Sequence, residues 1–256
     1  MDRKGDESMH VSETGSGRPL LLLHGAGVAG WMWRPTLERL DGGFRVIVPD
    51  LPGFGRSSAE TYPTHRAVVD ELAGILRDLA PHGALVAGFS LGAQLAIALA
   101  AAEPDLVTGA VIVSAEARPA RFRRTTLAML SAAAPLARRP SFARVQAREL
   151  SIPSELIDDY VRDSAATSRR TLLASVGENL AFRLPPAWAG YPGPVEVLAG
   201  AGERPIMRES SSLVAAAHGR ASQVVAGAAH DLPFTRPDLV AAAIHACSEA
   251  SGPARP

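Results

Sequence analysis

The sequence is poor in the residues that mark several common kinds of protein. Its 256 residues include one cysteine, Cys247, so neither an intramolecular disulfide nor a cysteine-built metal site can form, and a reducing compartment fits. Lysine occurs only once, at Lys4, and 26 basic residues balance 26 acidic ones. This balance gives no reason to expect nucleic acid or an anionic membrane as the partner. We therefore expect a small molecule as the main partner.

The distribution of apolar residues along the sequence also shows no targeting or membrane-spanning segment. The first twenty residues are charged and polar and lack the apolar segment of a secretory signal. The longest apolar stretch, 91–102, is much shorter than the roughly twenty residues of a membrane span. No group of histidines and carboxylates has the spacing of metal ligands. The sequence thus predicts a cytoplasmic protein that uses no metal and no other cofactor.

Short apolar runs recur along the chain and alternate with helical stretches. Continuous apolar runs of this length are typical of parallel strands that are covered on both faces. The expected strands are 20–23, 44–48, 84–87, 110–113 and 194–198, with a weaker one at 222–225. The expected helices are 33–40, 65–79, 91–102, 208–218 and 237–248. The alternation predicts an α/β fold with a doubly wound, mostly parallel sheet.

The alternation stops between 114 and 194, where four helical stretches follow one another at 123–134, 142–150, 154–167 and 169–180. We expect Pro135, Pro140 and Pro153 to separate them. This predicts a helical cap at 117–186 inserted into a core formed by 1–116 and 187–256. Between 118 and 150 the segment has eight arginines and one acidic residue, Glu149. Such a cluster indicates either an anionic partner or ordinary solvated helix faces.

The most informative motif is Gly88-Phe89-Ser90-Leu91-Gly92, which follows an apolar run and precedes a helical run. Strand, sharp turn and helix in this order place the serine in strained backbone, while the two glycines let the strand and helix pass closely. The hydroxyl of Ser90 is then exposed at the carboxyl edge of the sheet. This context predicts a nucleophilic serine.

Three further motifs stand in a fitting order around it: His24-Gly25-Ala26-Gly27 after one strand, Asp50 to Ser57 after the next, and Gly227-Ala228-Ala229-His230 near the end. Together the four motifs resemble those of the α/β-hydrolase fold superfamily, from about residue 20 to the final helix. The resemblance implies a serine hydrolase with an inserted cap. It leaves the particular substrate open.

The resemblance also implies roles for individual residues. Ser90 is expected to be the nucleophile and His230, on the loop after the last strand, its general base. In this family two backbone N–H groups stabilise the oxyanion, and they map to Ala26 and Leu91. The family's acid usually follows the strand before the last one, where this chain has Glu203. Glu116 is the alternative acid, at a position from which some members of the fold supply theirs.

Side chains near these motifs are candidates for the substrate pocket. We expect His24, Gly25, Trp31 and Phe89 to lie near its mouth, although aromatic residues after such loops are at least as often part of the core. Nothing in the sequence indicates the oligomeric state.

Several activities fit the expected residues. The leading hypothesis is hydrolysis of a small ester, thioester, lactone or related acyl substrate such as an activated amide, through an acyl-enzyme. Members of this fold that use an aspartate nucleophile, the dehalogenases and epoxide hydrolases, are disfavoured by Ser90. Cofactor-free haloperoxidase or perhydrolase activity, carbon–carbon bond hydrolysis and hydroxynitrile cleavage use the same triad and stay open. A ligand sensor with vestigial hydrolysis is a further alternative, since the fold alone does not determine function.

Overall fold

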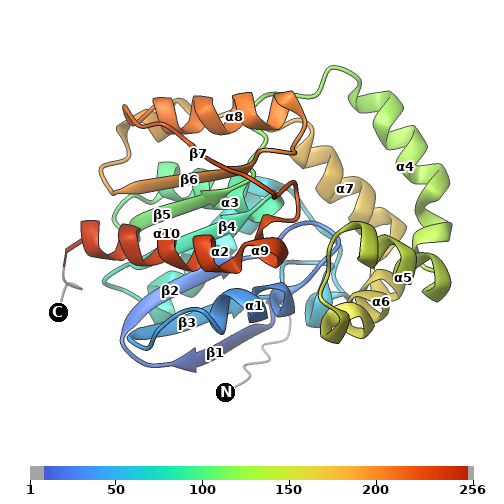
Figure 1. Ribbon diagram of the computed structural model, residues 1–256, viewed down its shortest axis with the longest axis horizontal. Coiled ribbons are helices and arrows are strands. Elements are labelled where there is room, and N and C mark those ends of the chain that lie inside the picture. The colour runs from blue at the N-terminus through green and yellow to red at the C-terminus, as the bar shows by residue number, and fades with distance from the viewer. Residues whose placement is uncertain (1–8, 253–256) are drawn as a thin grey trace.

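A sheet of seven strands runs through the centre of the computed structural model, which describes residues 9–252 (Figure 1). The strand order is β1-β3-β2-β4-β5-β6-β7, and each neighbouring pair is parallel except β1 and β3 at one edge. The strands are β1 (Val11–Gly15), β2 (Arg18–Leu23), β3 (Phe44–Pro49), β4 (Ala84–Phe89), β5 (Val107–Val113), β6 (Val195–Gly200) and β7 (Gln223–Val225). The prediction of an α/β fold with a mostly parallel sheet is confirmed.

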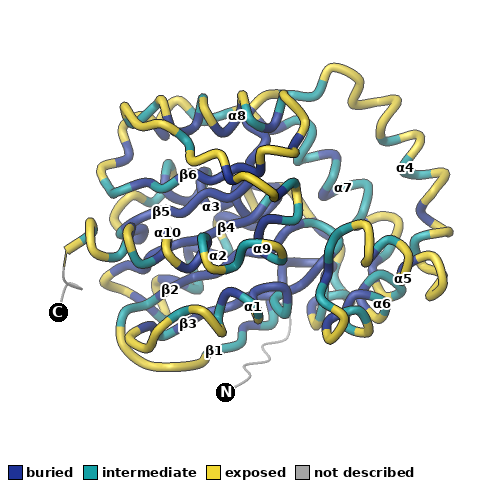
Figure 2. Tube along the Cα trace, in the orientation of Figure 1, coloured by how far each residue is buried: buried dark blue, intermediate teal, exposed yellow. Residues whose placement is uncertain are grey.

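The central strands are apolar throughout because helices cover both faces of the sheet. In β2, Leu20 and Leu22 join one core cluster, while Leu21 and Leu23 join the cluster on the opposite face, and all four are fully buried. Figure 2 shows the central strands as buried along nearly their whole length. This two-sided burial explains why the strands read as continuous apolar runs rather than as an alternation of apolar and polar residues.

Two groups of helices form these two layers. Helices α2, α3 and α8 supply apolar side chains to one cluster, and α9 and α10 to the other, with α1 packed against α10. The helices are α1 (Arg34–Leu37), α2 (His65–Leu79), α3 (Leu91–Ala102), α8 (Pro205–Ala216), α9 (Leu232–Thr235) and α10 (Pro237–Ala250), with 3-10 turns η1 (Gly30–Trp33) and η2 (Gly55–Ser57). The bounds of α2 and α3 match the prediction. The helix expected over 33–40 is instead a 3-10 turn followed by a single α-helical turn.

Strand β1 was not predicted from the sequence. It lies at the edge of the sheet, where it pairs only with β3, from Val11 opposite Pro49 to Gly15 opposite Arg45. Most of its residues are polar and partly or fully exposed. An edge strand of this kind needs no continuous apolar run, because only one of its sides is hydrogen-bonded and little of it is buried.

The segment between β5 and β6 is helical, as expected, and lies beside one end of the sheet (Figure 1). It consists of α4 (Arg123–Ala137), α5 (Pro140–Glu149), η3 (Ser154–Leu156), α6 (Ile157–Ala166), α7 (Arg169–Asn179) and η4 (Pro186–Gly190). We refer to α4–α7 as the cap. The expectation that Pro135 separates two helices is wrong, since it lies inside α4. Pro135 is exposed, so the helix carbonyl that it leaves without a donor can bind water.

The two connections between sheet and cap run close together and form a neck. The N–H of Ala120 donates to the Leu180 carbonyl at 2.8 Å, and the N–H of Leu184 donates to the Ala117 carbonyl at 3.3 Å. The buried amide of Gln94, on α3, donates to the carbonyls of Glu116 at 2.7 Å and Asn179 at 3.2 Å. Helix α3 therefore holds both sides of the neck.

Parts of some predictions fall outside the described residues. Residues 1–8 belong to the predicted core and to the N-terminal stretch without a signal pattern, and residues 253–256 close the predicted core. The division into core and cap at 117 and 186 remains a prediction. Within residues 9–252, no helix combines the length and the apolar character that crossing a membrane requires.

Candidate active site

Ser90 is the one residue between the end of β4 and the start of α3. Its backbone angles are φ 53° and ψ −111°, outside the regions that residues other than glycine usually adopt, and its N–H donates to the Val113 carbonyl at 2.9 Å. A Cβ atom at Gly88 would collide with the Gly92 carbonyl, and one at Gly92 with the Leu23 carbonyl. Both glycines are thus required for this sharp turn, which presents the serine side chain at the end of the strand.

His230 connects Ser90 with Glu203 through two hydrogen bonds. Its Nε2 lies 3.0 Å from Ser90 Oγ, and its Nδ1 lies 2.9 Å from Glu203 Oε1. An ionised carboxylate can only accept, so Nδ1 carries the proton and the Nε2 lone pair faces the serine hydroxyl. The Glu203 side chain has no exposed surface, whereas that of His230 is 44% exposed. The acid is therefore enclosed and the base reaches the open cavity.

The loops after β6 and β7 pack against each other and bring these two residues together. The N–H of Gly202 donates to the Ala228 carbonyl at 2.9 Å, and the N–H of Ala201 donates to the Val225 carbonyl at 2.8 Å. A Cβ at Gly200 would collide with the Ala229 carbonyl. Small residues on both loops therefore permit the close approach that places Glu203 against the imidazole.

Glu116 lies in the same region without making that contact. It lines a cavity of about 330 Å³ together with Ser90 and His230, but within residues 9–252 its carboxylate has no hydrogen bond to the imidazole. Burial raises the pKa of Glu116, and the nearby charges of Arg204 and His230 oppose part of that rise. Of the two acids considered from the sequence, the structure brings Glu203 to the histidine.

Two backbone N–H groups near Ser90 are available to an oxyanion. Leu91 is the first residue of α3, and Ala26 lies in the loop after β2. Neither N–H donates to an acceptor in the described part of the chain. The first N–H groups of a helix have no partner inside the helix, and the dipole of α3 adds positive potential at the same place.

His24 occupies a different position from the one expected at the pocket mouth. The side chain is fully buried, with Nδ1 donating to the Gly25 carbonyl at 2.8 Å and Nε2 accepting from the Leu51 N–H at 2.8 Å. Burial lowers its pKa, which agrees with a neutral ring that uses both nitrogens. The prediction is corrected: His24 ties the loop after β2 to the loop after β3 and has no exposed surface with which to line a pocket.

Phe89 and Gly25 lie beneath the catalytic groups. The ring centroid of Phe89 is 5.0 Å from that of His230, and the residue is 6% exposed. A Cβ at Gly25 would lie 2.9 Å from the Phe89 ring and 3.6 Å from the Ser90 Cβ. These residues therefore support the imidazole and the serine from below rather than line the pocket mouth.

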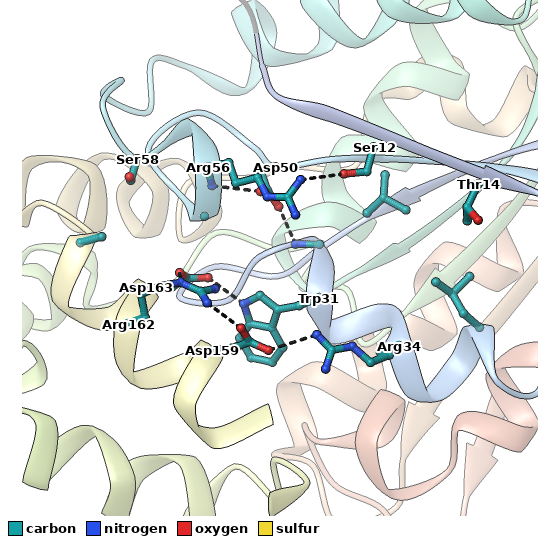
Figure 3. Close-up of a pocket in the computed structure, with 15 residues that line it drawn as sticks. Ser12, Thr14, Trp31, Arg34, Asp50, Arg56, Ser58, Asp159, Arg162 and Asp163 are labelled. Carbon is teal, nitrogen blue, oxygen red and sulfur yellow. Dashed lines mark hydrogen bonds and ion pairs between the residues drawn. The ribbon is translucent and has the colours of Figure 1, made fainter. Parts of the chain in front are cut away.

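Trp31 lines a separate cavity, shown in Figure 3. This space of about 660 Å³ lies between the sheet edge and α6, and Ser90 is not among its lining residues. The indole N–H donates to Asp163 Oδ2 at 2.7 Å, which links the core to α6. Arg34 and Asp159 form a second link at 3.1 Å. The structure thus places Trp31 at the junction of core and cap, and not beside Ser90.

A partly open cavity beneath the cap, with a mostly apolar surface and with Arg138, Gln146 and Arg169 among its lining residues, was not located by sequence reasoning. It has a volume of about 260 Å³ and extends from the oxyanion loop to all four cap helices. Small residues on one turn of α4, Ala134 and Ala137, are the signal that could have indicated it. Its lining includes Ala26, Gly27, Val28, Leu130, Ala134, Ala137, Leu172 and Val176.

Known proteins share this architecture. A pimeloyl-[acyl-carrier protein] methyl ester esterase of Vibrio vulnificus is 38% identical over 127 residues, 48% of this chain and 48% of that protein. The chain therefore matches about half the length of this curated relative. A thermophilic esterase from Thermogutta terrifontis has a TM-score of 0.76, 24% identity and coverage of 95% of this chain and 94% of that chain. A bromoperoxidase from Bacillus anthracis has a TM-score of 0.80, 16% identity and coverage of 94% and 95%.

A match to a family model, which covers most of the chain, identifies the family. The family model described as "Alpha/beta hydrolase family" matches residues 20–243, which include the serine turn, the neck, the cap and the histidine loop. The chain belongs to the alpha/beta hydrolase family.

Proposed function

We propose that this protein is a serine hydrolase that cleaves carboxylic esters of small or medium acyl groups through an acyl-enzyme. The observation that carries the proposal is the hydrogen-bonded series Ser90, His230 and Glu203, with contacts of 3.0 and 2.9 Å. A nucleophile in contact with a base, and a base oriented by an acid, is the arrangement that acyl transfer requires.

Acylation begins when His230 Nε2 removes the proton from Ser90 Oγ as that oxygen attacks the ester carbonyl carbon. The buried Glu203 carboxylate stabilises the imidazolium that forms. The backbone N–H groups of Leu91 and Ala26 donate to the developing oxyanion. When the tetrahedral intermediate collapses, the bond to the leaving oxygen breaks, and the imidazolium gives its proton to that oxygen, so that the alcohol departs.

Deacylation repeats these steps with water as the nucleophile. His230 accepts a proton from the water as its oxygen attacks the acyl carbonyl carbon. The same two N–H groups hold the second oxyanion, and the proton returns to Ser90 Oγ as the carboxylic acid departs. The exposed face of His230 gives water access to the base.

The acyl group is assigned to the apolar cavity beneath the cap and the alcohol to the more polar cavity beside Glu116. The volumes of about 260 and 330 Å³ suit small and medium groups. The names of the curated relatives give a methyl ester on a carrier-bound acyl chain, so methyl esters are the first alcohol class to test. We place the enzyme in the cytoplasm, as the single cysteine suggests.

An organophosphonate and an ester series test the proposal. We expect the phosphonate to label Ser90 alone, as mapped by mass spectrometry, and Ser90→Ala to remove both labelling and turnover. Acyl chains of increasing length on p-nitrophenol and on methanol should show burst kinetics followed by steady hydrolysis. Thermal melting of Ser90→Ala serves as the control for folding.

Other outcomes would assign another activity. A ligand sensor would give one turnover or none, whereas an esterase gives sustained turnover. Halide oxidation with peroxide at a rate above that of ester hydrolysis would indicate a perhydrolase. Labelling at a residue other than Ser90 would contradict the assignment of the nucleophile.

A further inference from the structure

The end of helix α5 has a conformation that normally calls for glycine. Ser151 is the first residue beyond the helix cap and has φ 54°. Its N–H donates to the Arg148 carbonyl at 3.0 Å, while the N–H of Ile152 donates to the Ala147 carbonyl at 2.9 Å. These two bonds define a Schellman motif, whose left-handed position is usually glycine because a Cβ atom is strained there.

The serine hydroxyl has a partner outside the cap. Ser151 Oγ donates to Asp231 Oδ2 at 2.6 Å, across 80 positions of sequence. Glycine would relieve the backbone at this site but would remove that hydrogen bond. A strained residue that makes one specific long-range contact points to a function for the contact.

Asp231 directly follows the catalytic histidine. Its other oxygen, Oδ1, accepts the Ala229 N–H at 2.8 Å, so the carboxylate holds the backbone on the preceding side of His230. The loop begins at Gly227, which has φ 76°, and both Ala226 and Gly227 are exposed. The Ala228 carbonyl is held by the Gly202 N–H of the loop after β6, and the Asp231 carboxylate holds the neighbouring Ala229 N–H. The Asp231 carboxylate is therefore one of the two contacts that fix the backbone before His230.

We propose that Asp231 is a positioning residue for His230 and that Ser151 couples the cap to it, so that the placement of the cap sets the alignment of the base. The inference rests on the proposed hydrolase function. Asp231 touches neither Ser90 nor the imidazole within the described chain and acts through the loop backbone. Catalysis is sensitive to such placement, since a shift of about 1 Å can cost roughly 100-fold in rate.

Ser151→Gly gives the sharpest test because it separates stability from positioning. Glycine fits the left-handed position, so the melting temperature should stay equal or rise. We expect kcat and the rate of phosphonate labelling to fall roughly 10- to 100-fold together, with KM for an acetate ester little changed. Ser154→Gly is the matched control and should keep kcat, since among residues 9–252 its hydroxyl bonds only to the neighbouring Glu155.

Two further measurements complete the test. Asp231→Ala should lower kcat at least as much, and the double variant with Ser151→Gly should lose little more than Asp231→Ala alone, because Asp231→Ala already removes the acceptor of the Ser151 hydroxyl. Amide hydrogen exchange at Ala229 should be about tenfold faster in Ser151→Gly, and this measurement needs no activity.

The failures of the two proposals can be told apart. Unchanged exchange at Ala229 in Ser151→Gly, or an active wild type whose kcat survives that change, would overturn the coupling. Additive losses in the double variant would do the same. A wild type that neither hydrolyses esters nor takes up the phosphonate would remove the hydrolase proposal, while the exchange measurement would still decide whether Ser151 holds the loop.

Discussion

Helices α3 and α4 show how differently the core and the cap are built. In α3, nine of twelve residues are buried, including Leu95 and Leu99, whereas α4 has fifteen residues and only Ala134 is buried. Figure 2 shows the same contrast, with α3 dark and α4 mostly exposed. Large apolar side chains exposed on or beside α4 and α5 are Phe122, Met129, Leu136, Phe142 and Val145. Close packing therefore fixes the catalytic residues, while the roof above them can vary at little cost in stability.

The helices of the cap differ in how they are attached to the core. Helices α6 and α7 are tied to the core through Trp31 and Asp163 at 2.7 Å and through the Glu178 carboxylate, which accepts the His65 N–H at 2.9 Å. Helix α4 contacts mainly α7 and α5. Helices α6 and α7 are thus attached to the core, while α4 covers one side of the cavity of about 260 Å³.

The largest expected effect concerns the core, where Glu203→Gln should lower kcat by about 10⁴-fold with little change in KM. The amide cannot stabilise the imidazolium and holds the imidazole less well in the required tautomer. The loss of kcat should be the same for every ester in the acyl series, and steady-state kinetics would measure it. Glu116→Gln is the matched control and should keep kcat within tenfold, because Glu116 makes no hydrogen bond to His230 in the described chain. The reverse result would transfer the role of the acid to Glu116.

A direct comparison of the two helices uses one truncation in each. Leu95→Ala should lower the free energy of unfolding by about 2–5 kcal/mol, because the side chain is fully buried and leaves a cavity. Met129→Ala should change it by less than about 0.5 kcal/mol, because Met129 is 69% exposed. Urea denaturation of both variants gives the two values. Equal losses would show that the cap is as tightly packed as the core.

Ala134→Leu fills the apolar cavity from the cap side. The added carbons should lower kcat/KM for long acyl esters by roughly 10- to 200-fold and leave the acetate ester unchanged, since steric exclusion depends on chain length. Ala133→Leu, on the exposed side of the same helix, is the control and should leave the ranking of esters as it is. If Ala134→Leu left the ranking unaltered, the acyl group would lie in another cavity.

The smallest effect belongs to Glu116 and depends on pH. Burial raises the pKa of this carboxyl in the folded state, so folding favours the protonated form and the protein loses stability as the pH rises above the unfolded value of about 4.3. Glu116→Gln has no proton to lose. Its melting temperature should exceed that of the wild type at pH 7, and the difference should shrink below about pH 4. A constant difference across this range would show that the pKa is not raised.

Local patterns predicted the buried parts of the core well. The bounds of α3 follow from an unbroken apolar and alanine-rich run, and the serine turn is determined by steric contacts of Gly88 and Gly92. Glu203 and His230 were implied by the resemblance to the α/β-hydrolase fold, and each lies on a short loop after a strand. In these places the physical constraint is local, so the sequence contains it.

Long-range contacts explain what the sequence did not reveal. His24 looked like a pocket residue until its bond to the Leu51 N–H was visible, and Trp31 until its bond to Asp163 was. Strand β1 depends on a partner about thirty positions away rather than on its own apolar residues. Ser151 carries no sequence signal, because its role arises only when α5 is placed beside the histidine loop.

The neck also has a consequence for how the family diversifies. Because the chain leaves the sheet near Ala117 and returns near Leu184, with the two crossings hydrogen-bonded to each other, the inserted segment begins and ends at one place. An insertion whose ends meet can be exchanged, lengthened or shortened while the strands that carry the chemistry stay in register. Grafting the cap of another family member between these two points is thus a single-site operation, and we expect it to carry substrate preference with it.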